Sequence, residues 1–192
     1  MPLVETVIHD IPLKLQTEDS LFSPKSPDRG TLAMLSAIEF QAEDRILDLG
    51  CGYGLVGILA AHFARPENVF LTDVDPIAVK VAQKNAAAHG LPGVTVQQSD
   101  GFKNFTEAGL TKILSNPPYH SDFAVAKRFI LKGFNRLKVG GHMYFVTKRE
   151  NWYRKSLSSA FGGCHVQSVD GYFVFTAEKR SESYAKRRSR VR

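Results

Sequence analysis

The chain has 192 residues, of which 43% are hydrophobic and 23% charged, the composition of one ordinary globular domain. No run approaches the ~18 apolar residues of a membrane span, and residues 1–10 lack the basic-then-apolar pattern of a signal peptide. Two cysteines are too few for a disulfide framework or a zinc site, so we expect a cytoplasmic protein that holds no metal and contacts no membrane.

The net charge of +6 belongs to the C-terminal end of the chain. Residues 179–192 hold seven basic side chains and one acid, whereas the other 178 residues hold 18 of each sign. We therefore predict a single domain over residues 1–179, followed by a basic, flexible tail over 180–192. Such a tail is either a solvated end or an arm that binds a polyanion such as RNA by releasing counterions.

The N-terminal part, residues 1–40, is predicted to form a β-hairpin and a helix. Apolar residues alternate over 4–15, which favours the hairpin, and a loop rich in Ser, Pro and Asp follows over 19–29. Leu32, Leu35 and Ile38 then recur at helical spacing, which predicts a helix over 31–40.

From residue 45 onward, predicted strands and helices alternate. Pro76 stands in the first turn of one helix and Gly90 follows its end, as is typical of helix boundaries. The predicted strands are 45–48, 69–72, 94–97, 112–114, 142–147, 166–169 and 172–176. The predicted helices are 55–64, 76–89, a short one after Phe102, 123–137 with its stop near Gly140-Gly141, and 152–161.

This order predicts an α/β fold of the Rossmann-like kind. Strands separated by helices favour a parallel sheet with helices on both faces. The last two strands are joined across Asp170-Gly171, a hairpin signal, and so add an antiparallel end to the sheet.

A glycine-rich turn, Asp-Leu-Gly-Cys-Gly-Tyr-Gly at residues 48–54, follows the first strand of the predicted sheet. In such sheets, ligands bind beyond the carboxyl ends of the strands. Asp48 and Gly50 therefore reach the ligand edge, while Gly52 and Gly54 allow a tight turn that a ligand can approach without meeting a Cβ atom. The turn predicts a site for a nucleotide-like ligand.

Two further acids end strands at the same edge. Asp73 ends the second strand, where its carboxylate can accept both hydroxyls of a ribose. Asp75, directly before Pro76, is predicted to cap the helix, which leaves Asp73 for the ribose. Asp100 closes the third strand and, with Phe102 behind it, contacts an adenine amino group or serves only as a turn residue.

A second motif, Asn116-Pro117-Pro118-Tyr119, stands about sixty residues after the glycine turn, at the end of the fourth strand. Prolines donate no main-chain hydrogen bond and fix the backbone, so the loop presents acceptors, Asn116 Oδ1 and the Pro117 carbonyl, beside an aromatic face. This arrangement suits a planar NH2 group: both protons are hydrogen-bonded and the nitrogen lone pair faces a methyl donor. Tyr119 would stack on a base, and His120 would orient the base or a phosphate, or be a solvated loop residue.

Together these motifs resemble class I S-adenosylmethionine (SAM) methyltransferases, and the chain is similar to the small-domain (MTS) family, whose best-known members methylate guanine N2 of ribosomal RNA. The similarity runs from about Val4 to Lys179. Leu21-Phe22-Ser23 and Asp28-Arg29-Gly30-Thr31 resemble the family's lead-in, which closes over the cofactor.

The resemblance implies a seven-stranded class I methyltransferase sheet with a terminal antiparallel hairpin and an N-terminal hairpin plus helix. It implies SAM as cofactor and an exocyclic amino group of an RNA base as substrate, with guanine N2 in ribosomal RNA first. The expected catalytic residues are Asn116, Pro117 and Tyr119; the cofactor residues are Asp48, Gly50, Gly52, Gly54, Asp73, Asp100 and Asn116; and the substrate residues are Pro118, Tyr119 and His120.

An NAD site is the alternative for the glycine turn, because residues 52–57 also match the GxGxxG dinucleotide fingerprint and Asp73 follows Gly52 by 21 residues. Two observations favour SAM. Asp48 puts an acid inside the turn, which is unfavourable beside a pyrophosphate and favourable beside the cationic methionine end of SAM. The loop at Asn116 has no role in hydride transfer.

Two alternatives remain for the function. A protein glutamine amide also carries a planar NH2 group, so a glutamine methyltransferase fits the same loop. The second alternative is a nucleotide- or RNA-binding module without catalysis, in which Asn116 and Tyr119 would have no catalytic role.

Overall fold

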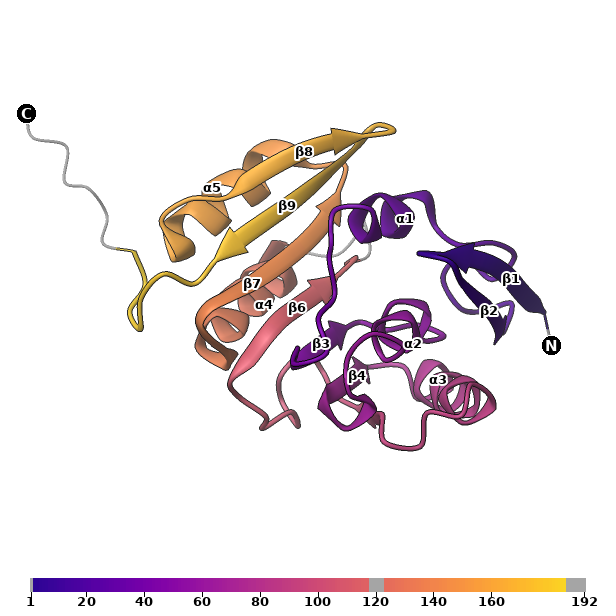
Figure 1. Cartoon of the computed structure of the whole chain (residues 1–192). Helices are drawn as coiled ribbons and strands as arrows, with labels where there is room; N and C mark the ends of the chain where they lie inside the picture. The colour runs from indigo at the N-terminus through magenta and orange to yellow at the C-terminus, as the bar shows by residue number, and fades with distance from the viewer. Residues whose placement is uncertain (1, 118–122, 186–192) are drawn as a thin grey trace, which may run out of the picture.

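The computed structural model describes residues 2–117 and 123–185, and its centre is a seven-stranded mixed sheet in the order β5-β4-β3-β6-β7-β9-β8 (Figure 1). The first five strands in this order run parallel to one another, whereas β9 pairs antiparallel with both β7 and β8. The predicted α/β class and its terminal antiparallel hairpin are therefore confirmed. The strands are β3 (Ile46–Leu49), β4 (Val69–Asp73), β5 (Thr95–Gln98), β6 (Leu110–Ser115), β7 (Leu137–Thr147), β8 (His165–Val169) and β9 (Tyr172–Glu178).

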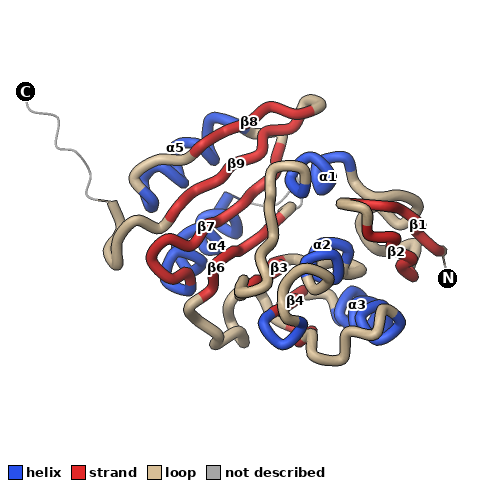
Figure 2. Tube along the Cα trace, in the orientation of Figure 1, coloured by secondary structure: helices blue, strands red, loops and turns tan. Residues whose placement is uncertain are grey.

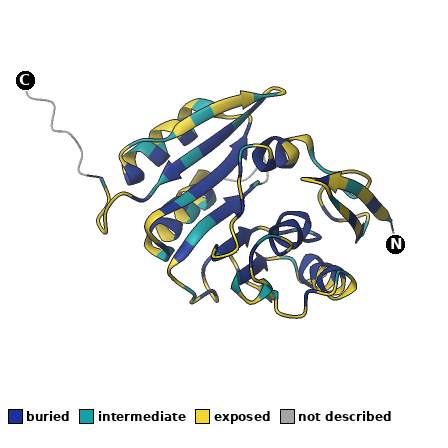
Figure 3. Ribbon diagram, in the orientation of Figure 1, coloured by how far each residue is buried: buried dark blue, intermediate teal, exposed yellow. Residues whose placement is uncertain are grey.

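Helices cover both faces of the sheet (Figure 2). On one face lie α1 (Arg29–Leu35), α2 (Leu55–Ala60) and α3 (Pro76–Ala88); on the other lie α4 (Phe123–Arg136) and α5 (Glu150–Phe161). Successive side chains of a strand point to opposite faces, so Ile46 of the central β3 joins the first apolar cluster and Leu47 and Leu49 join the second. Asp48 shares the face of Ile46, toward α2. Figure 3 shows the central strands buried between these layers.

The predicted N-terminal hairpin is confirmed as β1 (Leu3–Ile8) and β2 (Ile11–Gln16). Its two turn residues, His9 and Asp10, have φ of 50° and 64°, which matches the left-handed turn that suits the twist of paired strands. Asn85 on α3 holds the hairpin against the domain. Its Oδ1 accepts from Gln16 N at 2.8 Å, and its Nδ2 donates to the carbonyls of Gln16 and Tyr53, both at 2.8 Å.

Two predicted helices are shorter than expected. The helix predicted over 31–40 starts earlier, at the Asp28 cap, and ends at Leu35, because the Ser36 hydroxyl bonds to Ala33 O and the following amides form three-residue turns. Ile38 and Phe40 are nevertheless buried, so the apolar pattern predicted which residues are buried but not where the helix ends. In the same way α2 ends at Ala60, not at residue 64, although Ala61 and Ala64 are buried.

Two further predictions were wrong in detail. No helix follows Phe102 in the described stretch before β6, because Ser99 Oγ donates to Gly101 O and accepts from Asn104 N, closing a turn in which Gly101 has φ of 59°. Strand β7 begins at Leu137, directly after α4, and not after Gly140-Gly141. The two glycines stay in the sheet because Gly140 N donates to Lys179 O and Lys179 N donates to Gly141 O, each at 2.8 Å.

The chain beyond β9 folds back onto the α4–α5 layer as far as residue 185. Tyr184 packs on Phe134 with ring centroids 4.7 Å apart, and its hydroxyl donates to Leu131 O at 3.0 Å. Ala185 N donates to Ala160 O at 3.0 Å. The basic residues 186–192 lie outside the described residues.

None of the helices within 2–117 and 123–185 has the length and apolar character needed to cross a bilayer. The same ranges bring no three potential His, Cys, Asp or Glu metal ligands together.

Candidate functional site

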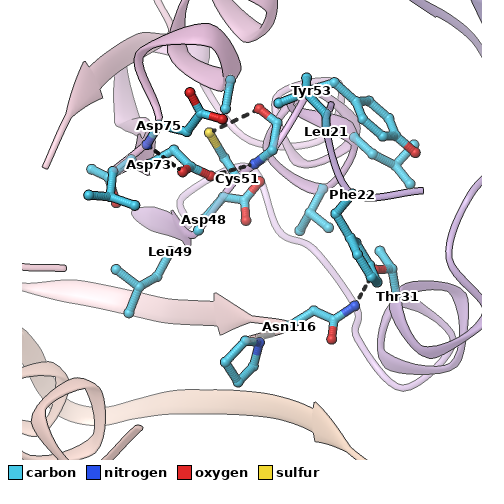
Figure 4. Close-up of a pocket in the computed structure, with 18 of the residues that line it drawn as sticks. Leu21, Phe22, Thr31, Asp48, Leu49, Cys51, Tyr53, Asp73, Asp75 and Asn116 are labelled. Carbon is cyan, nitrogen blue, oxygen red and sulfur yellow. Dashed lines mark hydrogen bonds between the residues drawn. The ribbon is translucent and has the colours of Figure 1, made fainter. Parts of the chain in front are cut away.

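A cavity of about 410 Å³ opens over the carboxyl ends of β3, β4 and β6 (Figure 4). Its walls come from segments far apart in the sequence: the loop at residues 20–23, the glycine turn, the ends of β4 and β5, the residues after β6, and α4. The cavity therefore gathers most of the predicted site residues at one place: Asp48, Gly50, Gly52, Asp73, Asp100, Asn116 and Pro117.

The glycine turn is held by the neighbouring strand. Gly50 N and Cys51 N both donate to Thr72 O, at 2.8 and 3.0 Å. Gly50, Gly52 and Gly54 have φ of 81°, 53° and 94°, a region that side chains disfavour. A Cβ atom on Gly50 or Gly52 would meet nothing within 4 Å. Glycine is needed there for the backbone turn, and the open space above it is available to a ligand.

Asp48 is a buried acid on the cavity wall, only 3% exposed. Its Oδ2 accepts from Gly57 N, in the first turn of α2, at 2.9 Å. Burial, with a smaller contribution from the charge of Asp73, raises the pKa of Asp48 to about 7. A cation in the cavity would oppose both effects, so the site is suited to positive charge next to Asp48.

Asp75 is the helix cap, as predicted, whereas the ribose role of Asp73 stays a prediction. Asp75 caps α3 through a 2.8 Å bond from Ile77 N. Asp73 accepts from Gly52 N at 2.8 Å and from Asp75 N at 3.0 Å, so it also orders the glycine turn. Each of its oxygens keeps acceptor capacity for a ligand hydroxyl, because a carboxylate has about four acceptor positions.

Asp100 lies at the rim of the cavity, with its side chain 53% exposed and 3.8 Å from Arg128. Phe102 is buried beneath it, and Phe129 from α4 forms part of the cavity wall. A Cβ atom on Gly101 would lie 2.8 Å from the Phe129 ring, so the loop after β5 and α4 are in close contact. An adenine contact by Asp100 stays a prediction.

Asn116 is held in one orientation by two residues that the sequence did not connect to it. Its Nδ2 donates to Asp28 Oδ2 and to Thr31 Oγ1, both at 2.9 Å. Because a carboxylate can only accept, Asp28 fixes which end of the amide is nitrogen. The Oδ1 atom is buried and accepts no hydrogen bond from any described residue. Figure 4 shows the hydrogen bond from Asn116 to Thr31.

Several predicted residues contribute differently or cannot be placed. Pro118, Tyr119 and His120 lie outside the described residues. Gly54 is the α2 cap, and a Cβ atom there would lie 3.0 Å from Ile58 Cδ1, so it serves packing as well as the turn. Cys51 is buried, and burial raises the pKa of its thiol well above its usual value, which fits a packing residue and not a nucleophile.

The α4 side of the cavity was not predicted from the sequence. Val125 and Phe129 line it, but on the sequence they were two apolar positions of an ordinary helix. The hydrogen bond between Asn116 and Asp28 was not predicted either, since the two residues lie 88 positions apart. The motif at residues 28–31 was noted on the sequence, but it predicted a contact with the cofactor and not with Asn116.

Comparison with known proteins adds three results. A family model described as the methyltransferase small domain matches residues 12–176. The ribosomal RNA small subunit methyltransferase C of Pseudomonas putida (strain F1) is 30% identical over 180 residues, which cover 91% of this chain and 54% of that protein. The uncharacterized protein YbxB of Bacillus subtilis is 31% identical over 170 residues, covering 85% of each chain.

Among solved structures, the T. thermophilus 16S rRNA N2 G1207 methyltransferase RsmC, in complex with AdoMet and guanosine, superimposes with a TM-score of 0.84 at 28% identity. The match covers 93% of this chain and 50% of that one. The chain thus spans about half the length of the RNA methyltransferases it matches.

Proposed function

The chain belongs to the methyltransferase small domain family, and from that premise we propose that it transfers a methyl group from SAM to an exocyclic amino group of an RNA base, with guanine N2 in ribosomal RNA as the leading target. The observation that carries the proposal is the buried Oδ1 atom of Asn116. This acceptor is held in one orientation, has no partner among the described residues, and belongs to a cavity lined by acidic side chains. The expected location is the cytoplasm, where such an RNA would be met.

The residues present fit SAM better than NAD. The methionine end of SAM is cationic, and Asp48 offers a buried carboxylate whose raised pKa a cation would lower again. The same carboxylate, held by the Gly57 N–H at 2.9 Å, would be unfavourable beside a pyrophosphate. Asp73 would accept the ribose hydroxyls and Asp100 the adenine amino group. SAM itself supplies the methyl group on a sulfonium.

The task of the substrate loop is to hold the amine. Asn116 Oδ1 and the Pro117 carbonyl accept its two N–H groups, which leaves the nitrogen lone pair directed at the methyl group. Tyr119 and His120 would stack on and orient the base, with Pro118 fixing the loop. No general base is needed before transfer, since the nitrogen proton becomes acidic once the nitrogen is alkylated. The gain is positioning and electrostatic stabilisation.

The cofactor assignment is tested by calorimetry. The protein should bind SAM and S-adenosylhomocysteine at about micromolar Kd, worth about 8 kcal/mol, and NAD not detectably. Asp73→Ala should weaken SAM binding, since it removes the ribose acceptor and loosens Gly52. Tight NAD binding without a SAM signal would reverse the assignment.

A further inference from the structure

An aromatic and cationic cluster lies on the surface outside the cavity, and the proposed chemistry does not use it. Phe123, the first residue of α4, is 36% exposed. Its ring stacks on Trp152 of α5, with centroids 4.5 Å apart and planes at 24°. The guanidinium carbon of Arg149 lies 5.0 Å from the Phe123 centroid. We call Phe123, Trp152 and Arg149 the stacking patch.

The fold places the stacking patch at the same edge of the sheet as Asn116. Strands β6 and β7 are parallel neighbours with Ser115 opposite Phe145, so the chain leaves both strands at the same edge of the sheet, as Figure 1 shows. Asn116 follows β6 directly. Arg149 stands two residues after β7, with its backbone N–H donating to Thr147 Oγ1 at 3.1 Å. Asn116 and Arg149 therefore both lie just beyond the carboxyl ends of neighbouring strands.

A packed connection joins the two places. Lys148 Nζ lies 4.9 Å from the centroid of the Tyr172 ring. A Cβ atom on Gly30 would lie 2.8 Å from that same ring, so Gly30 and Tyr172 are in contact. Gly30 stands between Asp28 and Thr31, the two residues that orient Asn116. Through Tyr172 and Gly30, the residue before Arg149 is thus packed against the segment that orients Asn116.

Charge identifies the partner. Within the described residues Arg149 forms no ion pair, and the adjacent acid, Glu150, pairs with Arg154 one turn further along α5. The patch therefore offers flat aromatic surface and a guanidinium that no acid of the described residues pairs, a combination that can stack on a base and reach a phosphate. An acidic or apolar protein segment would use only half of these features, whereas a nucleotide uses both.

We infer that the stacking patch binds the nucleotide next to the target nucleotide in an RNA strand, with its base extending the Phe123–Trp152 stack and its phosphate meeting Arg149. The inference rests on the proposed function, because it needs an RNA substrate in the adjacent cavity. It assigns an RNA-binding role to three residues that lie outside the cavity.

Trp152 is the one tryptophan of the chain, so its fluorescence reports on this patch directly. The probe is a single-stranded RNA octamer containing a central guanine, titrated at several salt concentrations. The parent should show saturable quenching. Phe123→Ala should weaken binding by about 5-fold or more, in keeping with the loss of one stacking surface. Arg149→Ala should lower the slope of log affinity against log salt by about 0.7, the contribution of one phosphate contact to a single strand.

A matched control is Lys138→Ala, which removes an exposed cation at the other end of β7 and should behave as the parent. Unchanged SAM binding by Phe123→Ala and Arg149→Ala would show that both variants are folded. If both variants then bind the octamer with parental affinity and salt slope, the inference is wrong. Quenching of the Trp152 fluorescence by a protein partner but not by RNA would also overturn it.

Methyl transfer to RNA by the parent separates this result from the proposed function. If the parent methylates RNA and the variants bind RNA with parental affinity, the inference about the stacking patch is wrong and the proposed function stands. If RNA quenches the fluorescence of the parent but not of the variants, and the parent methylates no RNA, the patch is an RNA-binding surface and the proposed function is wrong. With both ideas correct, the variants raise KM for the octamer and leave kcat close to the parental value.

Discussion

Removing the Asp28 carboxylate should reduce methyl transfer much more than it reduces stability. One oxygen of Asp28 accepts from both Thr31 N and Asn116 Nδ2, each at 2.9 Å. In Asp28→Ala, the lost helix cap costs about 1 kcal/mol and the lost charge-assisted bond about 1–2 kcal/mol. At roughly 2–4 °C per kcal/mol for a chain of this length, the melting temperature should fall by about 5–10 °C. The protein stays folded at the assay temperature.

The rate should respond through the orientation of Asn116. Without Asp28, the amide can turn its nitrogen toward the substrate, and a misplacement of about 1 Å costs roughly 100-fold, so kcat should fall by about 10- to 100-fold. The matched control is Asp28→Asn, which retains one oxygen for both donors and should stay within about threefold of the parent in rate. Single-turnover assays with saturating SAM measure the effect. A parental rate in Asp28→Ala would refute the orientation argument.

Three further predictions concern charge, packing and the C-terminal end. Burial raises the pKa of Asp48 to about 7, so the carboxylate is charged above that pH and protonated below it. SAM affinity, measured by calorimetry, should therefore weaken by up to about tenfold per pH unit below 7. The Asp48→Asn variant should lack this pH dependence. Gly57→Ala would place a Cβ atom 2.4 Å from Leu71 Cγ and should cost at least about 1–3 kcal/mol in thermal denaturation, whereas Gly163→Ala, which meets nothing within 4 Å, should be nearly neutral. Deletion of residues 186–192 should leave folding and SAM binding unchanged but lower the salt slope of RNA binding by about 0.7–0.9 per lost phosphate contact; an unchanged slope would mean that this segment is only a solvated end.

The sheet and its ligand edge were predictable from local signals. β-Rich runs separated by helical runs identified all seven strands of the sheet, and the Pro76 and Gly90 boundaries placed α3 within one residue of its C-terminal end. The glycine turn and Asp73 reached the same cavity because parallel strands end at one edge. These features depend on residues close together in the chain, or on the topology alone.

Features that depend on side chains meeting across the fold were not predictable. The helix expected after Phe102 is replaced by a turn because the Ser99 hydroxyl bonds to the backbone on both sides of Gly101. The tail predicted to start at residue 180 was inferred from charge, which gave no sign that Tyr184 would pack on Phe134. The Asp28–Asn116 bond joins two loops that the sequence separates by 88 residues.

The central claim is that Asn116 presents a planar amino group of RNA to SAM. The most direct measurement incubates the parent and Asn116→Ala with methyl-labelled SAM and, in parallel, ribosomal RNA, ribosomal subunits and a glutamine-containing release factor, followed by nucleoside analysis of the labelled RNA. We predict N2-methylguanosine in the parent's RNA reaction, none with Asn116→Ala, and SAM affinity nearly equal for the two proteins. Label in the release factor alone, or parental transfer by Asn116→Ala, would contradict the account.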